Sequence, residues 1–80
     1  MDNTITNEQL SLENFIDYLF TSSLDEKFKY RKNIIFTMKR FGKNALLTEL
    51  AKQGVKKNNL VETIMLAKLT RDILDAKNNA

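Results

Sequence analysis

Residues 23–42 read SLDEKFKYRKNIIFTMKRFG, and this stretch decides the fold that the sequence predicts. Ser23, followed three residues later by Glu26, forms a capping box, in which a hydroxyl and a carboxylate satisfy the first free N–H groups of a helix. Gly42 stands where such a helix has to end, because glycine readily adopts the left-handed backbone that closes helices. The stretch therefore predicts one helix from about Ser23 to Phe41.

The spacing of apolar and charged residues gives this helix two different sides. At about 100° per residue, one broad side is predicted to be core and carries Phe28, Tyr30, Ile34, Ile35, Met38 and Phe41. The opposite side is cationic, has an aromatic residue in its middle and Asn33 at its border, and carries Lys29, Lys32, Phe36, Lys39 and Arg40. Residues three and four positions apart are neighbours on a helix. The sequence therefore predicts a continuous basic patch centred on Phe36.

Such a patch has three readings. An exposed aromatic ring among cations suits phosphates lying beside a base, or an acidic protein surface that offers an apolar pocket. The third reading is a solvated lysine face in which Phe36 is covered by another helix. The sequence leaves all three open.

The rest of the chain also has helical spacing. Apolar residues at three- and four-residue intervals predict helices over about 11–21, 44–53 and 59–76, with Gly54 ending the third helix and Asn58 or Asn59 capping the fourth. No run alternates with a period of two for long enough to predict a strand. The predicted fold class is all-α, a compact domain of three or four helices over residues 11–77, with a polar N-terminus at 1–10 and a polar tail at 78–80.

The fourth helix is apolar on two sides, and this raises the question of a dimer. One seam contains Leu60, Ile64, Ala67 and Leu74, and the other contains Leu66, Leu69, Ile73 and Ala76. Either the helix is central to the domain, or it is shared across a two-fold interface. A chain of 80 residues hides only about 60% of the surface of its unfolded form, so it gains much from added buried area. For a homodimer, the predicted interface residues are Leu66, Leu69 and Ile73.

The segment 46–66 resembles a helix-turn-helix motif of DNA-binding proteins. Leu50, Gly54 and Leu60 stand where the motif places a first helix, a turn and a second helix. The motif usually has a small residue four positions before its turn glycine, whereas Leu50 occupies that position here. A plain helical hairpin explains the same residues.

The charges are distributed very unevenly along the chain. Residues 1–26 contain six acidic residues and no Lys or Arg, whereas residues 27–57 contain ten basic residues against Glu49 alone. The net charge of +3 therefore conceals a strong separation of charge. Whether the acidic first helix folds back on the basic patch cannot be decided from the pattern.

The composition argues against most enzyme chemistry. The chain has no Cys and no His, two Gly and no Pro, so it lacks the commonest general base, the commonest zinc ligands and the glycines of phosphate-binding loops, and its serines have no His to activate them. Asp72 and Asp75 share a helix face, but with basic neighbours they predict a solvated surface and no metal site. We expect no enzyme activity, no cofactor, no metal and no small-molecule substrate. The chain also has no apolar run near the roughly 20 residues of a membrane span and no secretory signal, so we expect a cytoplasmic protein without membrane association.

Together these features predict a small non-enzymatic regulatory protein that binds nucleic acid through the basic side of the second helix. The predicted binding residues are Lys29, Lys32, Phe36, Lys39, Arg40, Lys43, Lys52, Lys56 and Lys57. The alternative is a protein-binding modulator or inhibitor. It would dock its basic helix on an acidic partner or its acidic first helix on a basic partner.

Overall fold

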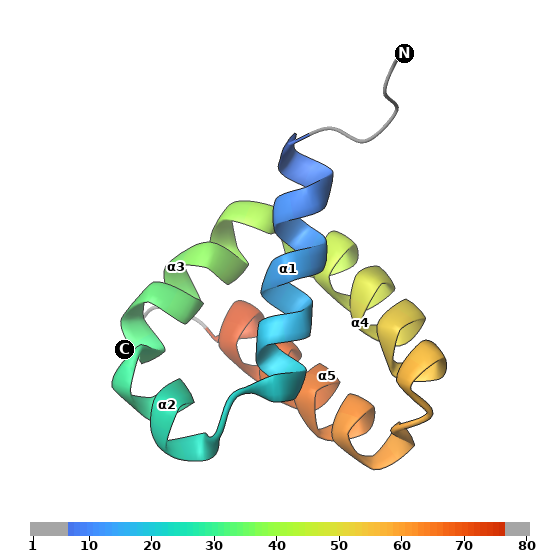
Figure 1. The fold of residues 1–80 in the computed structure, drawn as a ribbon. Helices are drawn as coiled ribbons and strands as arrows, with labels where there is room; N and C mark the ends of the chain where they lie inside the picture. Colours follow the sequence, from blue (N-terminus) through green and yellow to red (C-terminus); the bar gives the residue numbers. More distant parts are fainter. Residues whose placement is uncertain (1–6, 77–80) are drawn as a thin grey trace.

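The computed structural model describes the backbone of residues 7–76 and the side chains of residues 11–76. Within this part the chain forms five α-helices and no strand (Figure 1), namely α1 (Asn7–Thr21), α2 (Leu24–Lys29), α3 (Arg31–Phe41), α4 (Lys43–Lys57) and α5 (Leu60–Asp75). The all-α prediction is confirmed, and the structure has five helices where three or four were predicted. Most of the predicted polar start and the predicted tail at 78–80 lie outside the described residues, and α1 begins four residues before the predicted Ser11.

The helix predicted over 23–41 is divided at Tyr30. Its start is as predicted, and the Ser23 hydroxyl accepts a hydrogen bond from the N–H of Glu26 at 3.1 Å. The Glu26 carboxylate makes no hydrogen bond to Ser23, so only half of the predicted capping box forms. Tyr30 then adopts φ −104° and ψ 23°, which turns the chain between α2 and α3. As a result none of the residues of α2 is buried, and Phe28 is 68% exposed and Tyr30 43% exposed. The prediction that Phe28 and Tyr30 belong to the core was therefore wrong.

The two glycines have different roles. Gly42 follows α3 with φ 92°, a backbone conformation that favours glycine, and the predicted helix end there is confirmed. Gly54 does not end a helix, because α4 continues to Lys57 and closes at Asn58, whose backbone is left-handed at φ 54° and ψ 46°. Asn59 then caps α5 by accepting a hydrogen bond from the N–H of Glu62, as predicted.

This later helix end removes the resemblance to a helix-turn-helix. The turn lies at residues 58–59, four residues after the glycine on which the motif was placed. In the motif the second helix presents polar side chains to base edges. The outer side of α5 instead begins with exposed Leu60, Val61 and Ile64. The segment is a helical hairpin.

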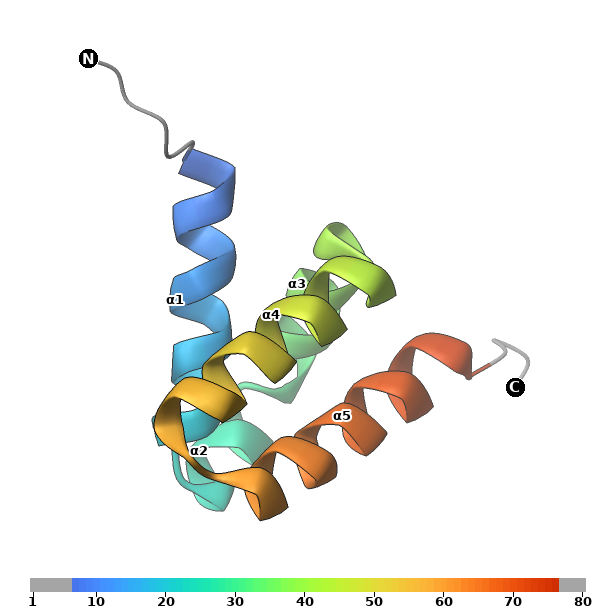
Figure 2. The ribbon, with the colours of Figure 1, turned by 90° about the vertical axis from the view of Figure 1, so that its right-hand side faces the viewer.

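The core lies where α1, α3, α4 and α5 meet. Figure 2 shows α1 and α5 on opposite sides of the molecule, with α3 and α4 between them. The buried apolar side chains are Ile16, Leu19, Ile34, Met38, Leu46, Leu50 and Leu66. Ile35 and Phe41 are half-buried at the edge, so four of the six residues predicted for the core side of α3 do lie on its inner side. This packing fixes the direction in which α3 presents its other side.

Gly54 is buried where α4 crosses α5. A Cβ atom added at Gly54 would lie 2.9 Å from the Cβ of Thr63 and closer still to the two outer atoms of that side chain. The Thr63 hydroxyl itself donates a hydrogen bond to the carbonyl of Asn59 at 2.6 Å. Only glycine therefore lets the two helices approach this closely.

Candidate nucleic-acid interface

The outer side of α3 presents the predicted basic patch to solvent. Lys32, Lys39 and Arg40 are exposed, and Phe36 between them is 70% exposed. The reading in which another helix covers Phe36 is therefore wrong. Because Ile34 and Met38 are held in the core, the helix cannot rotate without exposing them. We call the surface made by Lys32, Phe36, Lys39 and Arg40 the α3 face.

The cations of the α3 face form no ion pair with any carboxylate among the described residues. The ion pairs in that part of the chain are Lys43–Asp75 at 2.7 Å, Lys57–Asp17 at 2.8 Å and Lys68–Asp72 at 3.8 Å. The described acidic residues of α1 thus face α4, and they do not neutralise α3. The sequence left open whether the acidic first helix covers the basic patch. Within residues 11–76 it does not.

The predicted lysines of α4 do not join the α3 face. Lys43 and Lys57 are held in ion pairs with Asp75 and Asp17. Lys52 and Lys56 line a groove between α1 and α4 together with Glu13, Asn14, Asp17, Glu49, Gln53 and Lys57. In this groove the carboxylates lower the positive potential that an anionic ligand would meet. The structure therefore separates the predicted lysines of α4 from the α3 face, with Lys52, Lys56 and Lys57 in the groove beside α1 and Lys43 beside Asp75 of α5.

Lys29 lies at the end of α2, beyond the turn at Tyr30. Its ammonium group sits 5.4 Å from the centre of the Tyr30 ring. Arg31 begins α3, and its guanidinium group stacks 4.4 Å from the centre of the exposed Phe28 ring. Sequence reasoning missed Arg31 as a binding residue, because the predicted helix places it on the apolar side, with Ile34, Ile35 and Met38. Lys29, Tyr30, Arg31, Lys32 and Asn33 together line a hollow of about 290 Å³, which we call the cationic hollow.

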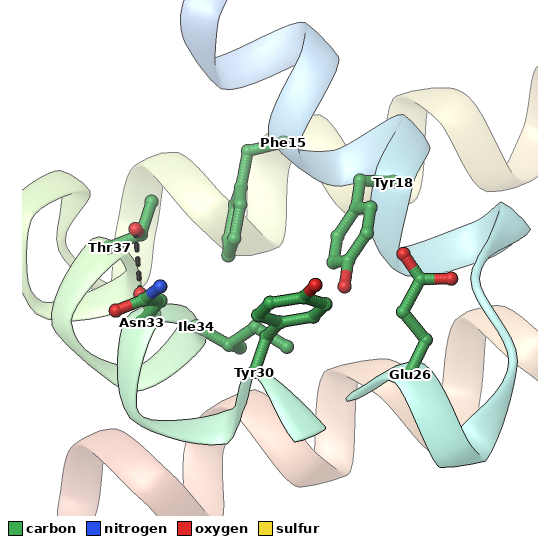
Figure 3. Close-up of a pocket in the computed structure, with 7 residues that line it drawn as sticks. All are labelled: Phe15, Tyr18, Glu26, Tyr30, Asn33, Ile34 and Thr37. Atoms are coloured by element: carbon green, nitrogen blue, oxygen red, sulfur yellow. Dashed lines mark hydrogen bonds between the residues drawn. The ribbon is translucent and has the colours of Figure 1, made fainter. Parts of the chain in front are cut away.

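A second hollow, of about 390 Å³ and wide open to solvent, lies between α1 and the α2–α3 junction (Figure 3). We call it the aromatic cavity, and it is lined by Phe15, Tyr18, Glu26, Tyr30, Asn33, Ile34 and Thr37. The Phe15 and Tyr18 rings descend from α1, and the Tyr30 ring lies below them. The Glu26 carboxylate stands beside the Tyr18 hydroxyl, while Asn33 lies at the other end. Sequence reasoning missed this cavity, although the presence of Asn33 at the border of the patch was noted.

The surroundings of Tyr18 favour the neutral form of its hydroxyl even more than water does. Partial burial raises the pKa of Tyr18 above its usual value, and the negative charge of Glu26 raises it further, while the nearby Ser22 has a smaller opposing effect. At neutral pH the hydroxyl is therefore a hydrogen-bond donor, and the carboxylate beside it is an acceptor. The cavity thus combines aromatic walls with polar groups of both kinds.

The chain was also compared with models of protein families, with curated proteins and with solved structures. None of these comparisons found a match. Between residues 7 and 76, none of the helices has both the length and the apolar character needed to cross a membrane. In the same part of the chain, no three side chains of the metal-binding types are grouped closely enough to hold an ion.

The first half of α5 presents an apolar surface on its outer side, whereas exposed Lys68, Arg71 and Asp72 occupy the second half. Leu60, Val61, Ile64 and Met65 are 59–72% exposed, and Leu69 lies at the edge of this surface, next to the groove of α2 and α3. This surface meets an apolar groove of about 460 Å³ that is lined mainly by Leu19, Leu24, Phe28, Ile34, Ile35, Leu69 and Ile73. Apolar patches of this extent on a small chain mark contact surfaces. We call the five exposed residues of α5 the α5 face.

The predicted dimer interface needs a correction. Leu66 is only 4% exposed and packs in the core of its own chain, so its side chain is not available to a second copy. Leu69 is exposed, and Ile73 is half-buried in the apolar groove. The inward side of α5 takes residues from both predicted seams, Leu66 and Ile73 from one and Ala67 and Leu74 from the other, whereas Leu60, Ile64 and Leu69 are exposed. The division of this helix into two seams was therefore wrong.

Proposed function

We propose that this chain is a non-enzymatic regulatory protein that binds nucleic acid through the α3 face. The observation that carries the proposal is an exposed Phe36 surrounded by cations that have no carboxylate partner among residues 11–76. Lysine and arginine neutralise phosphates, and an exposed ring stacks on bases. The cationic hollow extends the same surface with Lys29 and Arg31.

An acidic protein partner remains the alternative occupant of the α3 face. The other form of that alternative, in which the acidic first helix docks on a basic partner, has less support. Asp17 is already paired with Lys57, and Glu13 accepts a hydrogen bond from Gln53 through its backbone carbonyl. Docking through α1 would have to compete with these contacts.

The test of the proposal is the salt dependence of binding. We expect the full chain to bind a mixed-sequence oligonucleotide with an affinity that falls as salt rises, with a slope of about −0.9 per phosphate contact on duplex DNA and about −0.7 on a single strand. Replacing Lys32, Lys39 and Arg40 together by Ala should flatten this slope by about two to three units. Circular dichroism should show unchanged helix content, because all three side chains are exposed.

A matched control removes three cations from elsewhere. The variant with Lys52, Lys56 and Lys68 replaced by Ala has the same net charge as the test variant, and these three side chains are also exposed. We expect it to retain most of the slope. If both variants reduced the salt slope equally, net charge alone would attract the oligonucleotide. The α3 face would then be rejected as the site. Binding to an acidic protein but not to any oligonucleotide would favour the alternative.

In the same proposal, a second copy of the chain covers the α5 face. Among the side chains of residues 11–76, seven apolar ones are buried in the core, whereas ten large apolar ones are at least 41% exposed, five of them on α5. A small domain with so little buried apolar surface gains stability by association. Two-fold dimers are the commonest oligomers, and they bring the same surface of both copies together.

We expect Met65→Glu to weaken this self-association by about tenfold or more, because it places a charge at the middle of the α5 face. Sedimentation equilibrium at micromolar concentrations would compare the variant with the unchanged chain. Val55→Glu is the control, since Val55 is also exposed (82%, against 61% for Met65) but lies on α4. A chain that stays monomeric throughout this concentration range, before any substitution, would contradict the dimer.

A further inference from the structure

We propose that the aromatic cavity takes one unpaired base of a single-stranded nucleic acid, while the cationic hollow beside it holds the adjoining phosphates. This proposal rests on the proposed function and narrows its ligand to single strands. It assigns a role to Phe15, Tyr18 and Tyr30, none of which belongs to the α3 face. It also explains why two hollows of different chemistry lie next to each other.

The first step of the argument is the shape of the cavity. Three rings from two parts of the chain line a single space of about 390 Å³, with Phe15 and Tyr18 on one side and Tyr30 on the other (Figure 3). Flat aromatic walls suit a flat ligand, and the bases of single strands stack on protein rings regardless of sequence. A base inside a duplex is stacked on its neighbours and cannot enter without leaving the helix.

The second step is the polar lining. Neither the Glu26 carboxylate nor the side-chain amide of Asn33 makes a hydrogen bond to another described residue, and the two groups lie at opposite ends of the cavity. A carboxylate accepts hydrogen bonds, and the exocyclic amino groups of cytosine and adenine donate them. Uracil and thymine have a carbonyl in that place, so the cavity should prefer bases that carry an amino group.

The third step is the position of the cations. Tyr30 and Asn33 line both the aromatic cavity and the cationic hollow, so a base in the first places its own phosphates near the second. Lys29, Arg31 and Lys32 supply the positive charge there. From Asn33 the surface continues one helical turn along α3 to Phe36, which is a second stacking platform. One strand can therefore follow α3 and use both sites.

The experiment uses the full chain with labelled oligo(C) and oligo(U), two single strands whose bases differ in the amino group. We expect tighter binding of oligo(C), measured by fluorescence anisotropy. Tyr30→Ala should weaken both complexes by about tenfold, because one stacking surface is lost. Tyr30→Phe keeps the ring and should bind as the unchanged chain does. Val55→Ala removes an exposed apolar side chain of α4, outside both the aromatic cavity and the cationic hollow, and should have little effect.

Two further measurements distinguish a base bound in the aromatic cavity from electrostatic attraction of the strand to the basic surface. The chain has two tyrosines and no tryptophan, and both tyrosines line the aromatic cavity. A base stacked there should shift the ring resonances of Tyr18 and Tyr30 upfield in proton NMR spectra. Glu26→Ala should remove the preference for oligo(C) over oligo(U), since it deletes the acceptor.

The possible failures can be told apart. If Tyr30→Ala binds both strands normally and the tyrosine resonances stay unchanged, the base site is wrong, even when the variant of Lys32, Lys39 and Arg40 loses binding. Equally tight binding of a duplex with unshifted tyrosine resonances would also overturn the base site and leave the proposed function standing. If the full chain binds neither single strands nor duplexes at low salt, the proposed function fails, and the base site fails with it.

Discussion

Met38→Ala is expected to lower the free energy of unfolding by about 2–5 kcal/mol, whereas Phe36→Ala, two residues earlier in the same helix, should change it by less than about 0.5 kcal/mol. Met38 is 0% exposed and touches the core, while Phe36 is 70% exposed. Removing a buried side chain loses its transfer free energy and leaves a cavity, and neither cost arises for a ring that already lies in water. The smaller side chain would thus matter far more than the larger one.

Urea unfolding followed by circular dichroism would measure both variants at one protein concentration. Ile35→Ala serves as an intermediate control, because Ile35 is half-buried at the edge of the same helix. A loss of more than about 2 kcal/mol in Phe36→Ala would mean that Phe36 is covered in solution. In that case α3 does not present the ring to a ligand, and the α3 face has no aromatic residue on which a base could stack.

The contrast between Phe36 and Met38 could be predicted from the sequence, because both residues lie in an unbroken helix of regular period. The prediction was wrong for Phe28 and Tyr30, which were assigned to the same helix. A helical projection holds only while each residue adds the same rotation, and the backbone of Tyr30 interrupts it. No Gly or Pro marks this turn, so the sequence contains no local signal for it.

For the candidate site, too, one part could be predicted from the sequence and another part could not. The cations of the α3 face are neighbours within one helix, and their spacing was sufficient to group them. The aromatic cavity instead joins Phe15 of α1 to Tyr30 and Asn33, across at least 15 positions of the sequence. Likewise, the ion pair between Lys57 and Asp17 removes a predicted binding residue through a contact 40 positions apart. Such contacts depend on how the helices pack, which local spacing does not determine.

For α5 the sequence showed that more than one side of the helix is apolar, but it did not show which residues face the core. Two seams were recognised, and the structure turns Leu66 inward together with Thr70, which is 1% exposed. Thr70 belonged to neither predicted seam, and the inward side also includes Ala67 and Leu74 of the other seam, so apolar spacing alone did not identify it. The buried Gly54 opposite Thr63 explains the choice, because the close crossing of α4 and α5 fixes which side of α5 faces α4.

Gly54→Ala is therefore expected to destabilise the protein by about 1–3 kcal/mol, although alanine is the better helix former by about 1 kcal/mol. The new methyl group would lie within 3.0 Å of three atoms of Thr63, one of which is its Cβ. That atom moves only with the backbone, so α5 has to shift away from α4. A shift of α5 also disturbs Leu66 and hence the core.

A double-mutant cycle with Thr63→Ala tests this cause. Thr63→Ala removes the two outer atoms, but it also loses the hydrogen bond to Asn59, so alone it should cost about 0.5–1.5 kcal/mol. In the double variant much of the clash is gone, and the loss of stability should be smaller than the sum of the two single losses. Strictly additive losses, or a stabilised Gly54→Ala variant, would mean that the two helices do not approach closely at this point. Different residues of α5 would then face α4, and the residues assigned to the α5 face would change as well.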